Sequence, residues 1–265
     1  MKLLVIDIGN TESVLGIYHN DRLTATARLS SKTTRTADEC WIFFKLWCEN
    51  SGIDFATIQG AIISSVVPSL TAVFQHMVSD HLNLVPTTVT SETDTIIKIN
   101  YEIPEQVGAD RICNAVAGVL LYGAPLIIVD LGTATTFDVI DLDNIYLGGA
   151  IALGLMGASR ELHRLAAKLP RVGLQFPKSV VGRTTEQSIQ SGILWGTVAL
   201  IDGMVRKIKK EMEWDQVHVI GTGGTVQLIA DHSETIQTIQ PSLTLEGMRF
   251  IYQHLHKKHT EGGHA

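Results

Sequence analysis

The alternation of apolar and polar positions predicts a mixed α/β chain in which the same series of elements occurs twice. Alternating apolar runs predict strands, and apolar positions three and four residues apart predict helices. Strands are expected at residues 2–8, 12–19, 22–30, 59–67, 85–89, 126–130, 137–142, 145–147, 217–220 and 236–239. Helices are expected at residues 36–49, 68–82, 112–122, 184–213, 225–231 and 244–257, with another helical stretch after residue 150 that ends at 169.

Helix starts are marked by local signals. Thr36 and Glu39 have the spacing of a capping box, and the run 184–187 (Thr-Thr-Glu-Gln) repeats it before the long helix. Pro68 stands at a first helical position, where proline is favoured. Each half then has the same order: strand meander, helix, strand, helix. No linker rich in Pro, Gly or Ser separates the halves. We therefore expect two lobes, residues 1–122 and 123–265, packed across a cleft with the short join as a hinge.

Two of the expected buried strands end in the same short motif. Asp7 is followed by Ile8, Gly9, Asn10 and Thr11, and the run 130–135 (Asp-Leu-Gly-Thr-Ala-Thr) repeats the pattern. A carboxylate at the end of a buried strand needs a partner, and a metal ion is a common one. Glycine lets backbone N–H groups approach a ligand. The motif predicts a phosphate and cation site, although the same residues also occur in ordinary β-turns.

Asp110 is the sharpest single candidate for chemistry. It lies in the run Gly108-Ala109-Asp110-Arg111 at an expected helix start. One reading is a helix N-cap, because Asp is favoured there. The other is a general base for a substrate hydroxyl, with Arg111 binding a substrate carboxylate through its guanidinium fork. The two readings are compatible.

Charge and cysteine content narrow the class of protein. The chain has 265 residues, a net charge of −6 and 45% hydrophobic residues, so it can bury substantial cores but presents no basic field for nucleic acid. Three cysteines without close spacing predict reduced thiols in a cytoplasm and exclude a zinc knuckle. We expect no signal peptide and no apolar run of membrane-spanning length. The phosphate-binding loop that ends in Gly-Lys-Ser/Thr is absent, and the loop 221–224 (Gly-Thr-Gly-Gly) alone is a weak nucleotide signal.

The long expected helix carries a stripe of small residues. Gly192, Gly196, Ala199 and Gly203 share one helix face, where another backbone could approach closely. Glycine inside a helix costs about 1 kcal/mol relative to alanine, so packing must compensate. The stripe either packs on the chain's own sheet or forms a subunit interface.

Several stretches together resemble one family, the type III pantothenate kinases of the acetate and sugar kinase/Hsp70/actin superfamily. They are Asp7–Thr11, Gly108–Arg111, Asp130–Thr136, Gly148–Ile151, Ala167–Pro170, Thr184–Glu186 and Gly221–Gly224. The resemblance implies two ribonuclease-H-like lobes (the actin-like ATPase fold), each a mixed sheet flanked by helices, and a homodimer. It also implies transfer of the ATP γ-phosphate, with Mg²⁺, to the primary hydroxyl of pantothenate. The product would be 4′-phosphopantothenate, at the first step of coenzyme A synthesis.

The resemblance also implies roles for individual residues. Asp110 is similar to the proton acceptor, and Asp130 resembles the ligand of a monovalent cation, K⁺ or NH₄⁺. Thr185 resembles a substrate-contacting threonine that comes from the partner subunit. The expected pantothenate site comprises Tyr101, Gly108, Ala109, Asp110, Arg111 and Thr185. The expected ATP site comprises Asp7, Ile8, Gly9, Asn10, Thr11, Glu12, Ser13, Val14 and Thr133.

Two other functions stay open on sequence grounds. Another small-molecule kinase or a phosphohydrolase could use this fold, because a fold does not fix a substrate. Arg111 beside Asp110 favours an acidic alcohol over a neutral sugar. A regulatory protein that keeps the fold without the chemistry is the second alternative. The intact Asp110, both Asp-x-Gly motifs and the acidic balance argue against it.

Overall fold

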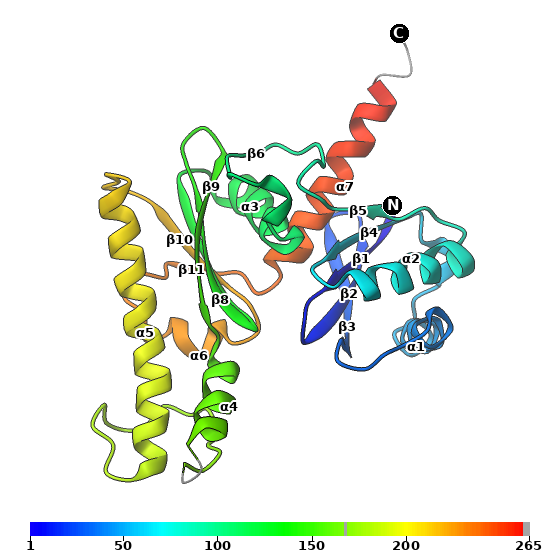
Figure 1. The fold of residues 1–265 in the computed structure, drawn as a ribbon. Helices are drawn as coiled ribbons and strands as arrows, with labels where there is room; N and C mark the ends of the chain where they lie inside the picture. Colours follow the sequence, from blue (N-terminus) through cyan, green and yellow to red (C-terminus); the bar gives the residue numbers. More distant parts are fainter. Residues whose placement is uncertain (167–168, 262–265) are drawn as a thin grey trace. The chain divides into compact units, whose positions relative to one another are not determined.

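The computed structural model describes residues 1–166 and 169–261, with side chains described as far as 257 at the C-terminal end. The chain divides into two compact units (Figure 1). The first unit comprises residues 1–117 and the helix that begins at Leu243, and the second comprises residues 118–242. The predicted halves 1–122 and 123–265 differ from these units in two respects: the boundary falls inside a helix, and the C-terminal helix joins the first unit. The division into domains 1–122 and 123–265 stays a prediction.

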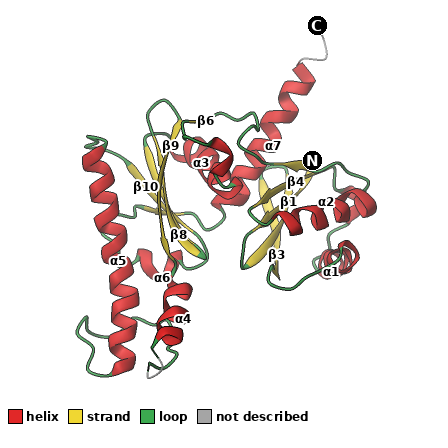
Figure 2. Cartoon of the chain, viewed as in Figure 1, coloured by secondary structure: helices red, strands yellow, loops and turns green. Residues whose placement is uncertain are grey.

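The first unit contains a mixed sheet with the strand order β3-β2-β1-β4-β5 (Figure 1), and Figure 2 draws its strands in yellow. Strands β1 (Lys2–Ile8), β2 (Glu12–His19) and β3 (Arg22–Ser30) form an antiparallel meander. Strands β4 (Gly60–Ser65) and β5 (Thr87–Thr88) continue the sheet in parallel. Alternate residues of β1 point to opposite faces of the sheet. Almost the whole strand is buried, because both of these faces are covered.

Helices cover both faces of this sheet. Helices α1 (Ala37–Asn50) and α2 (Pro68–Leu82) share a core with Leu4 and Ile6. Thr36 and Glu39 form the predicted capping box at α1. On the other face, α7 (Leu243–Glu261) packs so closely that a Cβ at Gly60 would overlap the Tyr252 ring. The remaining elements are η1 (Phe55–Thr57), β6 (Lys98–Ile99), η2 (Pro104–Gln106) and α3 (Ala109–Tyr122).

The second unit repeats the topology of the first. Its strands are β7 (Leu126–Leu131), β8 (Ala134–Ile140), β9 (Ile145–Leu153), β10 (His218–Thr222) and β11 (Thr238–Ile239). The order β11-β10-β7-β8-β9 places an antiparallel meander beside two parallel strands, as in the first unit. Helices α4 (Leu155–Leu165), α5 (Thr185–Glu211) and α6 (Val226–Ala230) complete the unit. Two repeated mixed sheets with helices confirm the predicted fold class.

Two of the predicted strand ends were wrong because glycines were read as the end of the strand. Gly148 and Gly149 were expected after the strand, but β9 continues through them to Leu153. A Cβ at Gly149 would overlap the Phe137 carbonyl on β8, so glycine here permits close strand approach and is not a turn signal. Likewise β10 includes Gly221 and Thr222.

Helix α5 corrects one further expectation and bears on one alternative that the sequence left open. Its length and composition would allow it to cross a membrane, so the expectation that no apolar run reaches that length was wrong. Its buried side chains, among them Ile193, Val198 and Ile201, belong to the core of the second unit, and this packing accounts for its hydropathy. The small-residue stripe does not pack on that core. Leaving aside chain neighbours and the α5 backbone, no described atom lies within 4 Å of a Cβ built at Gly192, Gly196 or Gly203.

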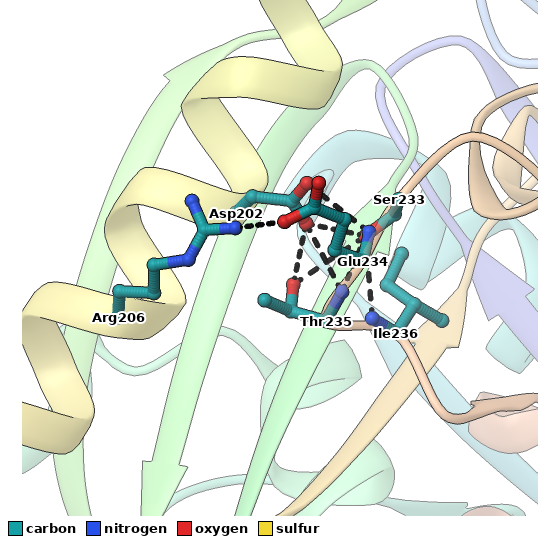
Figure 3. A network of polar contacts seen from close by, with 6 residues as sticks. All are labelled: Asp202, Arg206, Ser233, Glu234, Thr235 and Ile236. Carbon is teal, nitrogen blue, oxygen red and sulfur yellow. Dashed lines mark hydrogen bonds and ion pairs between the residues drawn. The ribbon is translucent and has the colours of Figure 1, made fainter.

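Asp202 on α5 hydrogen-bonds to the segment that links α6 and β11 (Figure 3). Its carboxylate accepts hydrogen bonds from the Ser233 hydroxyl at 2.7 Å and from the Thr235 hydroxyl at 2.7 Å. It also accepts from the backbone N–H groups of Glu234 at 3.1 Å and Thr235 at 3.2 Å. Arg206, one turn along α5, forms an exposed ion pair with Glu234. The carboxylate therefore holds the three-residue segment Ser233–Thr235 against α5 in the second unit.

Candidate functional site

Asp7 lies next to last in β1, where the sheet of the first unit meets the β1–β2 turn. The Gly9 N–H donates to the Glu12 carbonyl at 3.1 Å and closes this turn. Asp7 is in register with Ser64 on the parallel strand β4, and the Ser64 hydroxyl donates to Asp7 Oδ1 at 3.0 Å. Because β1 and β4 run parallel, their carboxyl ends share one edge, and Asp7 stands at this edge half-buried.

The rest of the predicted ATP segment divides into buried and accessible side chains. Asn10 and Glu12 are exposed, and Thr11 is half-buried. The side chains of Ile8 and Ser13 are buried, and the Ser13 hydroxyl lies 2.9 Å from that of Ser31. A ligand at this turn would therefore meet backbone groups and the side chains of Asp7, Asn10, Thr11 and Glu12.

Asp110 lies inside the first turn of α3. The helix begins at Ala109, so the N-cap reading of Asp110 was wrong by two positions. Asp110 Oδ1 accepts the Arg111 backbone N–H at 2.8 Å. Burial raises the pKa of the Asp110 carboxyl above its usual range, while the Arg111 N–H and guanidinium partly offset that effect. Arg111 itself is 9% exposed, whereas Tyr101 is 39% exposed on the segment before η2.

The charges of Asp7 and Asp110 both act on Cys113, which the sequence analysis treated only as a reduced thiol. Burial, and after it the charges of Asp7 and Asp110, raise the pKa of the Cys113 thiol well above its ordinary value. Cys113 is fully buried on α3, one turn after Asp110. In the first unit, Asp7 and Asp110 therefore lie near enough to the buried Cys113 thiol for their charges to affect its pKa.

A cavity of about 690 Å³ opens beside the Gly108–Ala109 backbone in the first unit. This volume suits a small-molecule ligand. Ser65, Val66 and Pro68 line it where β4 leads into α2, and the stretch 105–109 lines the opposite side. Glu92 and Glu105 bring carboxylates to its wall. Gly108 and Ala109 are therefore the predicted pantothenate residues that the structure places on a cavity wall.

Asp130 is the predicted cation ligand in the second unit. Asp130 lies next to last in β7, in register with Thr222 on β10 and Thr136 on β8. Gly223 has φ +92°, and a Cβ there would press on Asp130 Oδ1 and the Leu131 backbone. The weak Gly-rich signal at 221–224 thus marks a loop that closes over the Asp130 carboxylate.

Two other predicted residues also lie in the second unit. Thr133 is exposed in the β7–β8 turn, which the Gly132 N–H closes by donating to the Ala134 carbonyl at 3.0 Å. Thr185 is exposed as the first residue of α5. Thr184 caps this helix by accepting the Gln187 N–H at 3.2 Å. The Gln187 side chain accepts from the Arg183 N–H, so only the N-cap half of the predicted second capping box forms.

The described side chains do not form a complete metal site by themselves. Among the side chains described, those of residues 1–166 and 169–257, no group of three or more His, Cys, Asp or Glu gathers as a metal site. A cation at Asp7 or Asp130 would therefore be completed by oxygens of the nucleotide, the backbone or water, as is common for Mg²⁺ in kinases. Half-buried carboxylates at two turns fit such a role.

The comparison with protein families shows to which family this chain belongs. A family model described as Type III pantothenate kinase matches residues 3–207. The chain belongs to the type III pantothenate kinase family. The type III pantothenate kinase of Exiguobacterium sp. is 44% identical over 95% of this chain and 98% of its own length. That of Thermomicrobium roseum is 43% identical over 96% of this chain and 98% of its own length.

Solved structures show the same fold at low sequence identity. A putative Baf family transcriptional activator from Campylobacter jejuni superposes with a TM-score of 0.63 at 19% identity, covering 96% of this chain and 99% of that one. A ROK family glucokinase from Streptomyces griseus, in complex with glucose and AMPPNP, gives 0.52 at 12% identity, covering 96% and 100%. The predicted family and enzyme class are confirmed. The stretch Ala167–Pro170 lies partly outside the described residues.

Proposed function

We propose that this type III pantothenate kinase transfers the γ-phosphate of ATP to the primary hydroxyl of pantothenate, with Asp110 as the proton acceptor. Family membership supports the activity, the use of ATP with a divalent cation and the place in coenzyme A synthesis. The observation that carries the assignment of the base is the placement of Asp110. Its carboxylate is largely buried, lies in the first turn of α3, and shares its surroundings with Asp7.

The role of Asp110 follows from charge and proton balance. The carboxylate accepts the hydroxyl proton as the substrate oxygen bonds to the γ-phosphorus, and the bond from that phosphorus to the β,γ-bridging oxygen breaks to release ADP. Burial makes Asp110 a stronger base than an exposed aspartate, because it raises the carboxyl pKa. The guanidinium of neighbouring Arg111 keeps the carboxylate in its ionised form, since it lowers that pKa.

Pantothenate has a carboxylate, and charge favours one orientation for it. Glu92 and Glu105 in the wall of the cavity would repel this group. Arg111 and the Tyr101 hydroxyl are suited to bind it, with Gly108 and Ala109 as the surface along which the rest of the molecule lies. We assign Thr185 of the partner subunit to the same substrate.

The two Asp-x-Gly turns are assigned to the ATP phosphates. Backbone N–H groups of 8–14 and the accessible side chains around Asp7 contact the nucleotide, and Thr133 adds a contact from the second turn. Asp130 holds K⁺ or NH₄⁺ through its hard carboxylate oxygen. Bound cations neutralise the negative charge that develops on the phosphates. No lysine occurs in either turn, which fits the use of a monovalent cation.

A homodimer in the cytoplasm completes the proposal. The stripe of Gly192, Gly196, Ala199 and Gly203 on α5, exposed at all but the half-buried Gly203, supports a subunit interface, because its glycines gain no packing from their own unit. Three buried free cysteines suit a reducing compartment. The net charge of −6 gives no reason to expect nucleic acid as a partner.

The test is a coupled ADP-release assay with ATP, Mg²⁺ and K⁺ and a panel of hydroxylated acceptors. Pantothenate should be turned over well above glucose, glycerate and water, and mass spectrometry should find one added phosphate. Absence of pantothenate turnover would refute the substrate. Turnover of a neutral sugar in its place would favour the alternative of another small-molecule kinase on this fold.

A further inference from the structure

Ser64 has a buried hydroxyl that contacts Asp7, a residue of the proposed ATP site. It lies on β4 with 0% exposure, in a strand whose other inner residues are Ala61, Ile62 and Ile63. A buried hydroxyl is costly unless it is hydrogen-bonded. Ser64 gives its proton to a side chain rather than to a backbone carbonyl, because its Oγ donates to Asp7 Oδ1 at 3.0 Å. One oxygen of the Asp7 carboxylate is thereby occupied from within the sheet.

Cys113 completes a short chain of contacts that leads from Asp7 to α3. The Ser64 side chain lies close enough to the Cys113 thiol to influence it, and burial raises the pKa of this thiol well above its ordinary value. Cys113 follows Asp110 by three residues on α3, so the two side chains lie on the same side of the helix. The order of contacts is Asp7, Ser64, Cys113, and then the helix that carries Asp110.

The position of Cys113 is fixed from behind by α7. A Cβ at Gly247 would overlap the Cys113 carbonyl, so the two helix backbones touch at this point. Thr244, one turn earlier on α7, donates from its hydroxyl to Asn114 Oδ1 at 2.8 Å. The helix therefore has little freedom to shift along its axis, and the thiol stays within reach of Ser64.

We propose that Ser64, supported by Cys113, is a positioning residue that fixes the Asp7 carboxylate relative to the helix start that carries Asp110. This rests on the proposed function, in which Asp7 belongs to the ATP site and Asp110 accepts the proton. Phosphoryl transfer depends mainly on how precisely the reacting groups are placed. The hydrogen bond from Ser64 restrains rotation of the Asp7 carboxylate and so helps to fix its orientation at the edge of the sheet.

The test compares Ser64→Ala with wild type in the full-length enzyme. We expect kcat to fall by about 10- to 100-fold, and the KM for MgATP to rise, because orientation of the nucleotide is lost. The KM for pantothenate should stay within about twofold, because Ser64 does not line that site. Ser64→Thr keeps the hydroxyl and should recover most of kcat. A folded Ser64→Ala variant with both constants for MgATP within twofold of wild type would overturn the proposal.

A second pair of variants decides the matter if Ser64→Ala does not fold. Cys113→Ser retains a donor toward Ser64 and should stay near wild type, whereas Cys113→Ala should lower kcat several-fold. Cys48→Ala, a fully buried cysteine of α1, is the matched control and should keep wild-type kinetics. Equal kinetics for Cys113→Ala and Cys48→Ala would contradict the role of the thiol.

Failure of the proposed function gives a different pattern. If wild-type enzyme does not phosphorylate pantothenate, the substrate assignment is wrong, and calorimetric titration with Mg·AMPPNP still tests Ser64. The proposal then predicts roughly tenfold weaker nucleotide binding in Ser64→Ala than in wild type. Unchanged nucleotide affinity in that variant would overturn it independently of the acceptor substrate.

Discussion

Replacing Asp202 by alanine tests how strongly one buried carboxylate holds the second unit together. Asp202 is 5% exposed and accepts four hydrogen bonds from Ser233, Glu234 and Thr235 (Figure 3). Hydrogen bonds to a charged group contribute about 1.5–3 kcal/mol each, so an undiscounted sum would reach about 6–12 kcal/mol. Bonds to one carboxylate are not additive, and water can reach the partly exposed turn. We therefore expect a loss of about 3 kcal/mol in the free energy of unfolding.

The assay is urea-induced unfolding, followed by circular dichroism and tryptophan fluorescence. Trp195 lies 5.0 Å, ring centre to ring centre, from His232, which adjoins the Asp202 turn, so fluorescence reports on this region. Glu234→Ala is the matched control, because it removes only an exposed ion pair on the same turn and should cost less than about 1 kcal/mol. An Asp202→Ala loss as small as that of the control would refute the reasoning.

The pH dependence supplies a second check on Asp202. Burial raises the pKa of its carboxyl, but the hydrogen bonds from Ser233, Thr235 and Glu234 together outweigh burial, so the folded-state pKa is lowered. The stability that the carboxylate contributes is therefore present above the unfolded-state pKa of about 3.9 and is lost as pH falls through the folded-state value. The difference between wild type and Asp202→Ala should shrink in that acidic window and stay constant between about pH 6 and 8.

Three further predictions concern the site and the assembly. The acid limb of the kcat/KM profile should lie above the pKa of an exposed aspartate, because burial raises that of Asp110; a limb at or below the ordinary value would contradict this. Replacing K⁺ with Na⁺ should slow ATP use in a way that added Mg²⁺ cannot restore, and equal rates in both salts would remove the monovalent cation from Asp130. Gly196→Leu on this stripe should convert the proposed dimer to a monomer in light scattering, whereas Glu211→Leu at the far end of α5 should not. A folded dimer of unchanged mass in Gly196→Leu would exclude the stripe from the interface.

Local signals in the sequence predicted most element starts correctly, because their causes are local. The capping box at Thr36 and Glu39 forms as expected, and Pro68 is the first residue of α2. The repeated meander was also predictable, since alternation in a strand depends only on which face is buried. Errors arose where tertiary contact overrides a local signal. Gly148 and Gly149 resemble a turn but permit close strand packing, and α7 joins the first unit through contacts such as Gly247 with Cys113.

The candidate site was only partly predictable for the same reason. Asp7, Asp110 and Asp130 stand in motifs whose residue types indicate phosphate and proton chemistry. Ser64 and Cys113 carry no such signal, because their roles follow from the β1–β4 register and from the packing of α3. The available hint was weak: Ser64 is a polar residue near the end of an apolar strand, and Cys113 lies one helical turn after Asp110.

The most direct measurement of the central claim is steady-state turnover of pantothenate by Asp110→Asn, with folding checked by circular dichroism and pantothenate binding by calorimetry. The account predicts an intact fold, pantothenate binding within a few-fold of wild type, and a kcat lowered by a factor on the order of 10²–10⁴, the usual contribution of a general base. A folded variant that releases ADP at a near-normal rate would contradict the assignment of Asp110 as the proton acceptor.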